Sequence, residues 1–377
     1  MPIVKLADRK QNVSIRMVRS LSDMKELGPD WDALVNHYGH SPWYLRPFME
    51  RYMDLAIRER GDPVIIALTV AGRLEGFVAA TPKSYHGLKY LKSFYAGALT
   101  QDLVCNPEYR DVFLTAILDC AFGDLRCQFL ELFLPAESEC LQSLSSRSQS
   151  EGFSILQQPH FPHAVIPVEA SLDEFLRDRG RPKLGKEMRR TERILDELGD
   201  WEVRTLQVST PDAREGISKV EAVSWKDAWH ERTGIADRDL PVILDCAGPA
   251  SVVDPLFSAR VWFLELDGEP VAYTVVLQYK DTAFFAKNSY DNEFRKASPG
   301  VFLRNFVIRE MFLQKSITKI DFLTALGVHD RWGPSIEMRT RVLIARKGWV
   351  IPLVRLGQSR VGSTLVNVLS RIVPHSS

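Results

Sequence analysis

Residues 290–303 have the sequence YDNEFRKASPGVFL, which is the most informative local feature of the chain. The apolar residues of 282–290 predict a strand before it, and apolar residues at helical spacing after it predict a helix. Pro299 suits the first turn of a helix, whose free N–H groups attract an anion. Because Arg295 and Lys296 add positive charge, the stretch predicts a pyrophosphate site between strand and helix. An ordinary Ser-Pro helix cap is the alternative that these residues alone leave open.

Two β-hairpins are predicted at matching places in the two halves of the chain. Residues 64–80 turn at Ala71-Gly72, and residues 261–277 turn at Asp267-Gly268. The glycine at each corner supplies the positive φ that a tight hairpin needs. A helix and a short apolar strand follow each hairpin, so two copies of one mixed α/β unit are expected. Chance similarity between generic hairpins is the alternative.

The chain has 377 residues, more than one domain usually holds, so two domains are expected. A Ser-rich stretch at 143–150 and a Pro-punctuated stretch at 158–163 predict the end of the first domain and a connector. We therefore expect an N-terminal domain over 1–165, a C-terminal domain over 166–355 and an amphipathic tail over 356–377. Docking of the tail on its own domain is the default, and pairing with another subunit or contact with a membrane surface are the alternatives.

The composition excludes several classes of protein. Lys+Arg and Asp+Glu both number 48, which argues against binding of nucleic acid by overall charge, although a local basic patch is compatible with this balance.

Five cysteines without a CxxC pattern predict reduced thiols rather than disulfides or structural zinc. A cytoplasmic protein is expected because no run of about 18 apolar residues and no signal peptide occurs. His160 and His163 form an HxxH pattern, for which a loop is preferred over a metal site.

Local signatures of other enzyme classes do not occur in the sequence. There is no GxxxxGK[ST], no GxGxxG that opens a βαβ unit, no HExxH and no GxSxG. The sequence therefore disfavours an NTPase, a dinucleotide-dependent oxidoreductase, a zinc protease and a serine hydrolase.

A basic face is predicted on a helix over residues 182–198, after a capping-box pattern at Ser171-Leu-Asp-Glu174. Its cations are Lys186, Arg189, Arg190 and Arg193. Such a face is either solvated or recognises an anionic acceptor or carrier, for example a nucleotide-sugar, a phospholipid head, a phosphopantetheinyl carrier protein or tRNA. Trp225, on a later predicted helix, either packs in the core or forms a wall of the cleft.

The pattern Arg-x-x-Ser-x-Gly at 295–300 resembles the R/Q-x-x-G-x-G/A loop with which GNAT-superfamily acyltransferases bind the pyrophosphate of acyl-coenzyme A. Here Ser298 replaces the first glycine. Together with Asp321-Phe-Leu323 and Arg331-Trp332, the stretch resembles the CelD/BcsL-type acetyltransferase branch, which has tandem GNAT-like domains and is related to the Fem aminoacyltransferases. The first half has similar short motifs at Trp31-Asp-Ala-Leu34, Ser41-Pro42 and 71–76, so the resemblance covers roughly residues 15 to 345.

Two departures from the family pattern limit what the resemblance implies. Family members often carry a Tyr-Lys pair where this chain has Val328-His329, so the role of that lysine is not carried over. The corresponding stretch of the first half, Tyr95–Thr100, has no Arg-x-x-small-x-Gly pattern. We therefore expect the donor site in the second domain and a degenerate first domain that completes the acceptor cleft.

The resemblance implies acyl transfer from a thioester to an amine. The donor would be acetyl-coenzyme A or a longer acyl-coenzyme A. The residues that would hold it are Arg295, Lys296, Ala297, Ser298, Gly300 and Val301. Backbone amides at the end of the strand 283–290 would polarise the thioester carbonyl. An alkyl ammonium must lose a proton before it attacks, for which Asp321 and His329 are the candidate bases, with Tyr290 as the candidate acid toward the thiolate. The alternatives are that Asp321 caps or pairs with an arginine, that His329 is an exposed loop residue and that Tyr290 only packs. Lys186, Arg190 and Trp225 are the candidate acceptor-binding residues, and no metal is expected.

The resulting hypothesis is an N-acyltransferase of envelope, polysaccharide or specialised-metabolite biosynthesis that uses an acyl-coenzyme A or an acyl-carrier thioester. Its partners would be a small-molecule or carrier-bound amine, with an acyl carrier protein, tRNA or a second copy of the chain as further candidates. DNA and a transmembrane segment are not expected. Two other hypotheses stay open: a Fem-like transferase that uses aminoacyl-tRNA, and a non-catalytic scaffold that retains the fold.

Overall fold

The computed structural model describes residues 12–85, 87–94, 102–169, 171–180, 184–224, 226, 239–346, 348–352 and 354. The chain divides into two compact units. Unit 1 comprises Met1–His40, Met49–Phe161 and Met338–Ser377, and unit 2 comprises Ser41–Phe48 and Pro162–Glu337. The predicted boundaries at 165 and 355 stay predictions, and the tail 356–377 and the stretch 95–100 lie outside the described residues.

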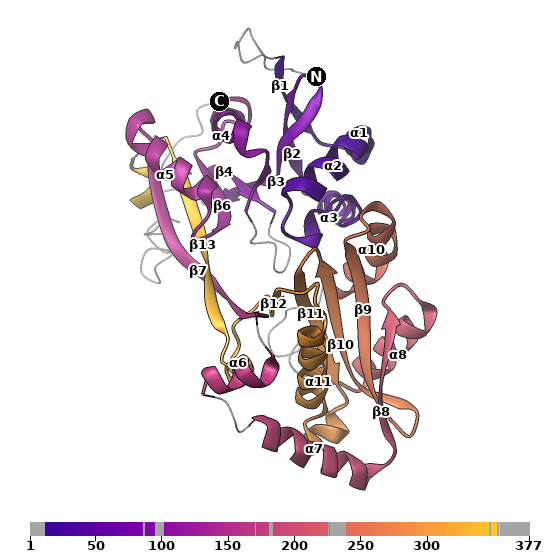
Figure 1. The fold of residues 1–377 in the computed structure, drawn as a ribbon. Helices are drawn as coiled ribbons and strands as arrows, with labels where there is room; N and C mark the ends of the chain where they lie inside the picture. Colours follow the sequence, from indigo (N-terminus) through magenta and orange to yellow (C-terminus); the bar gives the residue numbers. More distant parts are fainter. Residues whose placement is uncertain are drawn as a thin grey trace. The chain divides into compact units, whose positions relative to one another are not determined.

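Unit 1 contains a mixed sheet with helices packed against it (Figure 1). Its strands follow the order β1 (Val13–Val18), β2 (Val64–Val70), β3 (Arg73–Tyr85), β4 (Leu88–Ser93), β6 (Phe129–Pro135) and β13 (Ser335–Ala345), and β5 (Val104–Cys105) pairs with β3. The helices are α1 (Leu21–Glu26), α2 (Gly28–Tyr38), α3 (Arg46–Arg58), α4 (Arg110–Asp119) and α5 (Glu139–Glu151). Strands β4 and β6 are parallel, and α4 lies between them in the chain.

Unit 2 has the same kind of sheet (Figure 1). Its order is the end of β7 (Ser154–Pro167), β12 (Lys319–Asp321), β11 (Thr282–Tyr290), β10 (Glu269–Tyr279), β9 (Phe257–Leu266) and β8 (Trp201–Gln207). The helices are α6 (Leu172–Asp178), α7 (Leu184–Leu198), α8 (Pro211–Ala222), α10 (Asp239–Val253) and α11 (Pro299–Leu313), with 3-10 turns η4 (Asn292–Ala297) and η5 (Gly327–Trp332). Strands β11 and β12 are parallel, and α11 connects them.

The two units repeat one topology, as predicted. Each has antiparallel strands followed by a helix that crosses over to a parallel strand. The hairpin corners also match, because φ is positive at both turn residues in each: 51° and 86° at Ala71-Gly72, and 49° and 82° at Asp267-Gly268. Two positive φ angles define the type I′ turn that suits the twist of a hairpin. The predicted mixed α/β fold is therefore confirmed.

The stretch predicted to end the first domain is a helix, and the predicted connector is a strand rather than a loop. Residues 143–150 lie in α5, where buried Cys140, Leu141 and Leu144 recur at helical spacing and four serine hydroxyls donate to carbonyl groups of the preceding turn. Residues 158–163 lie in β7, so the two prolines did not exclude a strand. The cysteine prediction is confirmed, since all five thiols are free and buried.

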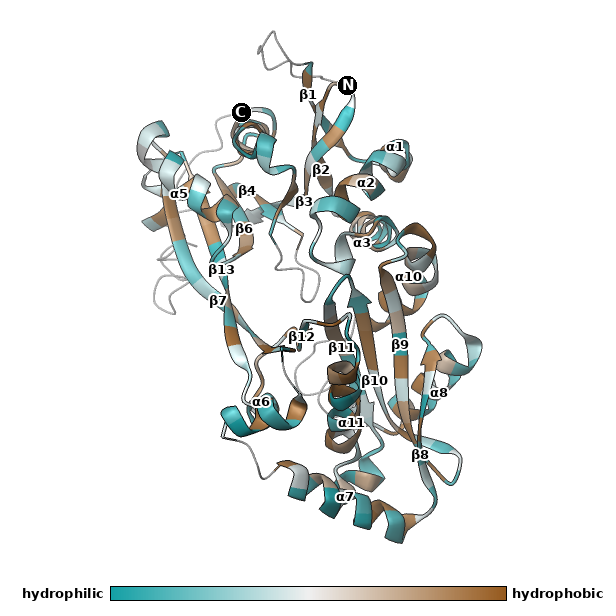
Figure 2. Ribbon diagram, in the orientation of Figure 1, coloured by the Kyte–Doolittle hydropathy of each residue, from teal (hydrophilic) through white to brown (hydrophobic). Residues whose placement is uncertain are grey.

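The faces of the unit 2 sheet carry different helices. Trp262 and Leu264 of β9 pack in the core that contains Leu303 of α11, whereas the intervening Phe263 meets Gly216 of α8. Side chains alternate between the faces of a strand, so α11 and α8 cover opposite faces. In Figure 2, β9 and β10 carry much brown (hydrophobic) and α7 is largely teal (hydrophilic), which agrees with its exposed basic residues.

Gly216 allows α8 to approach the sheet closely. A Cβ atom at position 216 would lie 2.8 Å from Cζ of the fully buried Phe263 ring. We expect Gly216→Ala to lower the free energy of unfolding by about 1–3 kcal/mol, despite the better helix propensity of alanine. Gly185 of α7 is the control, because its added Cβ would meet only Nη1 of Arg189, at 3.7 Å. Urea unfolding should show Gly185→Ala unchanged or stabilised by up to about 1 kcal/mol, and equal effects of the two changes would contradict the close packing.

Candidate functional site

The sheet of unit 2 opens between β11 and β12. The two strands pair over three residues only, from Thr282 opposite Lys319 to Phe284 opposite Asp321. Residues 285–290 continue to pair with β10, but no strand among the described residues covers their other edge. Ligands of open α/β sheets bind where parallel strands end at their carboxyl edge. The open edge of β11 is therefore the first element of the candidate site.

A left-handed residue joins η4 to α11. Ser298 has φ 52° and ψ 46°, a conformation that glycine adopts more easily than serine. This is the position where the GNAT loop pattern has its first glycine. Helix α11 starts at Pro299, which has no N–H group, and the amides of Val301 and Phe302 donate to the Ser298 carbonyl. Backbone geometry at Ser298 therefore fits the predicted loop without the glycine.

Gly300 lets Tyr290 pack against the start of α11. A Cβ atom at position 300 would lie 3.1 Å from Cδ1 of the Tyr290 ring. Tyr290, the candidate acid, is the last residue of β11 and is partly buried. The end of the strand and the start of the helix are therefore in direct contact.

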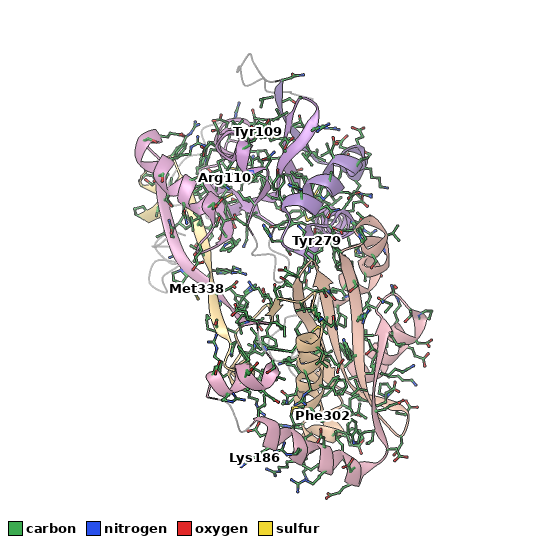
Figure 3. All side chains as sticks on the ribbon, in the orientation of Figure 1. Tyr109, Arg110, Lys186, Tyr279, Phe302 and Met338 are labelled. Carbon is green, nitrogen blue, oxygen red and sulfur yellow. The ribbon has the colours of Figure 1, made fainter. Side chains whose placement is uncertain are left out.

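Positive charge surrounds this helix start. Arg295 and Lys296 are exposed and form no ion pair with any described residue, while Ala297 is buried beneath them. Helix α7 contacts both η4 and α11, so its basic face lies in the same region of unit 2. Lys186 and Arg190, two predicted acceptor residues, are exposed on α7; Figure 3 labels Lys186 at the rim of the unit. Trp225, the third, lies outside the described residues.

Asp321 is buried and pairs with a histidine. Its side chain is 2% exposed, and its Oδ1 lies 3.2 Å from Nδ1 of the fully buried His163. The same carboxylate oxygen accepts a hydrogen bond of 2.6 Å from the amide of Leu323, whose φ is 60°. Sequence analysis missed His163 as a partner, although the apolar run that follows it is typical of a buried strand.

His329 is buried rather than exposed. It stacks on Phe322 with a centroid distance of 4.5 Å, and its Nδ1 lies 3.0 Å from the Thr324 carbonyl oxygen. Burial, and then the nearby positive charge of Arg304, lower the pKa of His329 to about 4, so the imidazole is uncharged at neutral pH. Phe322 follows Asp321 in the chain, so the structure brings the two candidate bases into one neighbourhood.

Arg304 of α11 is a buried cation that sequence analysis missed. Only 7% of it is exposed, and it forms no ion pair with a carboxylate of any described residue. Its Nη2 donates to Oδ1 of Asn288 at 2.6 Å, its guanidinium lies 5.7 Å from the Trp332 ring centre, and its Nε has no partner. Burial lowers the pKa of Arg304 to about 10. An unpaired buried charge is unfavourable for stability, which makes Arg304 a functional candidate.

Two polar atoms near Arg304 also lack partners. Asn288 stands opposite Thr274 of β10, which stands opposite Trp262 of β9, so the three side chains form a row on the α11 face. The Thr274 hydroxyl and the Trp262 indole N–H are buried and have no hydrogen-bond partner. Unpartnered buried groups are rare, so the row is a polar strip beneath α11 at the open edge of β11.

Neither a metal group nor a membrane span was found in the described ranges. In these ranges, no three or more His, Cys, Asp or Glu side chains are arranged to hold a metal ion. No helix there is long and apolar enough to cross a membrane.

The low pKa of His329 predicts how the stability of the protein depends on pH. The folded pKa of about 4 lies below the ordinary value of 6.5, so the unfolded chain binds the proton first as pH falls. Wild-type stability should therefore decrease from about pH 6.5 toward pH 4, and His329→Gln should lack this component. The difference in unfolding free energy between wild type and His329→Gln, measured in urea at several pH values, should change in favour of the variant as pH falls. A pH-independent difference would show that His329 titrates normally.

Comparison with known proteins supports the same fold. The chain covers 95% of the C-terminal domain of a putative lysylphosphatidylglycerol synthetase from Agrobacterium fabrum over 89% of its own length, with 13% identity and a TM-score of 0.53. For FemX the coverage is 90% of this chain and 99% of that chain, with 12% identity and a TM-score of 0.54. The match to L-PGS from Bacillus licheniformis covers 92% of this chain and 96% of that chain, with 11% identity and a TM-score of 0.52. Identities this low establish similarity of fold alone.

The sequence comparison concerns unit 2. No curated protein sequence matches the chain. Residues 182–332 match the family model of the acetyltransferase (GNAT) domain, and this range includes the η4–α11 loop, Arg304, Asp321 and His329. The narrower CelD/BcsL type stays a prediction. Residues 182–332 are therefore similar in sequence to the acetyltransferase (GNAT) domain family.

Proposed function

We propose that this protein is an N-acyltransferase that moves an acyl group from a thioester, acyl-coenzyme A or an acyl-carrier protein, to an amine. One observation carries the proposal: the start of α11, with two exposed and unpaired cations, lies at the carboxyl end of β11, where the sheet opens. A helix start with free positive charge suits a pyrophosphate, and an open strand edge suits the extended arm of a thioester donor. Envelope, polysaccharide or specialised-metabolite biosynthesis is the proposed setting.

The donor would bind at the loop through both charge and backbone. Arg295 and Lys296 supply charge-assisted hydrogen bonds to phosphate oxygens. Gly300 keeps the first turn of α11 close to Tyr290, at the end of β11. The open edge of residues 285–290 then offers backbone amides to the thioester carbonyl, as an oxyanion hole requires.

Arg304 would stabilise the negative charge that develops during acyl transfer. Its charge is not neutralised by a described carboxylate, and Asn288 of β11 holds its guanidinium beneath the open edge. In a buried environment a fixed positive charge acts more strongly on a developing oxyanion than in water. Arg304 is thus proposed as the main electrostatic contribution of the side chains.

The two candidate bases would have different roles. The Asp321 carboxylate is occupied by His163 and by the amide of Leu323, which supports a positioning role at the end of β12. His329 is uncharged at neutral pH, so it is able to accept a proton from the amine directly or through a water molecule. Tyr290, at the end of β11, stays the proposed acid toward the leaving thiolate.

Binding of coenzyme A tests the donor site. Arg295→Ala and Lys296→Ala should each weaken the affinity about tenfold, because each removes a charge-assisted contact with phosphate. Arg260→Ala, an exposed arginine of β9, is the matched control and should bind as wild type does. Isothermal titration calorimetry measures all three. Absent binding to the wild type, or equal binding to all variants, would contradict a donor site at this loop.

Arg304→Met separates a functional role from a structural one. The substitution removes a buried charge without a carboxylate partner, so the free energy of unfolding should stay the same or increase. The rate of thiol release from acetyl-coenzyme A in the presence of a panel of primary amines should fall about 100-fold. Wild-type rates in a stable Arg304→Met protein would remove Arg304 from the reaction.

The exposed basic face of α7 favours a second candidate, transfer from aminoacyl-tRNA as in the Fem relatives. A tRNA donor would bind with an affinity that falls steeply as salt increases, because phosphate contacts release counterions. Salt-sensitive tRNA binding without coenzyme A binding would favour this candidate. A protein that binds neither donor would be a non-catalytic scaffold.

A further inference from the structure

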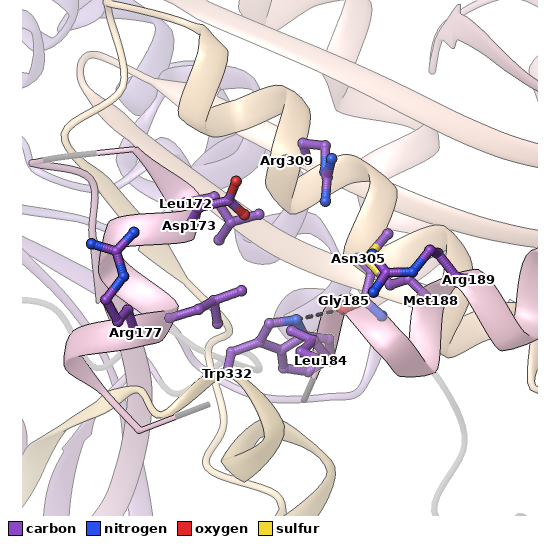
Figure 4. Close-up of a pocket in the computed structure, with 11 residues that line it drawn as sticks. Leu172, Asp173, Arg177, Leu184, Gly185, Met188, Arg189, Asn305, Arg309 and Trp332 are labelled. Carbon is purple, nitrogen blue, oxygen red and sulfur yellow. Dashed lines mark hydrogen bonds between the residues drawn. The ribbon is translucent and has the colours of Figure 1, made fainter. Parts of the chain in front are cut away.

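Unit 2 contains a cavity of about 250 Å³ away from the first turn of α11. Side chains from α6, α7, α11 and η5 line it, among them Arg177, Arg189, Arg309, Asp173, Asn305 and Trp332. Figure 4 shows the three arginines on three different helices around the same space. Its volume lies below the roughly 300–1,000 Å³ of drug-sized ligand sites, so it suits a small ligand or one group of a larger one.

The three arginines of the cavity have no carboxylate at ion-pair distance among the described residues. None of their guanidinium groups forms an ion pair or a hydrogen bond with a described residue, whereas nearby Arg331 pairs with Glu187 at 3.4 Å. Asp173 is the single carboxylate of the lining, so the cavity has a net charge of +2 at neutral pH. Three guanidinium groups around one cavity match a doubly charged phosphate better than a single carboxylate.

The wall of the cavity is fixed by buried interactions. The Trp332 indole N–H donates to Oδ1 of Asn305 at 2.6 Å, so the amide nitrogen of Asn305 stays available as a donor. Trp332 is 1% exposed and stacks on Phe322 with a centroid distance of 5.6 Å. Leucine and methionine side chains of α6 and α7 supply the apolar part of the lining. The cavity therefore combines buried, hydrogen-bonded walls with exposed cationic side chains.

We propose that this cavity binds the phosphate group of a phosphorylated ligand, with Arg177, Arg189 and Arg309 as its cationic contacts and Asn305 as a neutral donor. Asp173 suits a hydroxyl or ammonium group of the same molecule. All four basic residues of α7 are exposed, and among them Arg189 lines the cavity, together with Gly185 and Met188. The site is distinct from the η4–α11 loop, so it does not depend on the proposed donor.

Two probes distinguish the source of the phosphate. Glycerol 3-phosphate represents a soluble phosphate ester, and vesicles of phosphatidylcholine with phosphatidic acid represent a lipid headgroup. Binding of the first is measured by calorimetry and of the second by vesicle sedimentation, each with the full chain. The cavity variants are Arg177→Ala and Arg309→Ala, the surface control is Arg260→Ala, and Arg295→Ala reports on the donor loop. All four residues are exposed, so the variants are expected to fold.

The wild-type protein should bind at least one probe. Arg177→Ala and Arg309→Ala should each weaken that binding about tenfold or more. Arg260→Ala and Arg295→Ala should bind the same probe as the wild-type protein does. If the cavity variants lose affinity for glycerol 3-phosphate, the ligand is a soluble phosphate ester. If they lose affinity for the vesicles alone, the ligand is a lipid headgroup. The proposal is overturned if neither probe binds, or if the cavity variants bind as tightly as wild type. It is also overturned if the cavity variants lose coenzyme A affinity together with Arg295→Ala, because the cavity would then belong to the donor site.

Discussion

The Asp321 carboxylate determines how the sheet of unit 2 opens. It is the last residue of β12, pairs with His163 and accepts the hydrogen bond of the Leu323 amide, and Leu323 has a left-handed conformation just beyond the strand. Because β12 stops after three pairs, no strand of the described ranges covers the other edge of residues 285–290. The candidate donor path, the polar strip beneath α11 and the position of His329 all depend on this early end of β12. Strain in a left-handed leucine is often found where function requires a particular backbone path.

The local features of the fold were predictable from the sequence. The predicted strand 282–290 agrees with β11, the helix starts at Pro299, and the two hairpins turn where glycine follows Ala71 or Asp267. These features depend on periodicity and turn chemistry within a few residues. The helix over the Ser-rich stretch was not predicted, because the apolar residues of α5 at helical spacing outweigh the weak preference of serine for loops.

The functional centre was less predictable, because its residues meet across long sequence distances. His163 and Asp321 are 158 residues apart, and no local pattern connects them. Arg304 stands in an apolar helix, and its burial without a counter-ion follows only from the packing of α11 on the sheet. The cavity arginines come from three helices, so only the packing of these helices places them around one cavity. Zero net charge thus conceals three separate cationic places in unit 2: the loop, Arg304 and the cavity.

The central claim is that an acyl donor binds where α11 starts and β11 opens. Hydrogen–deuterium exchange with and without coenzyme A tests this claim most directly, because backbone amides report on both elements at once. We predict slower exchange for the amides of residues 297–303 and 285–290 when coenzyme A is present, with little change in β8 and β9. Unchanged exchange in both stretches, or protection confined to other parts of the chain, would contradict the account.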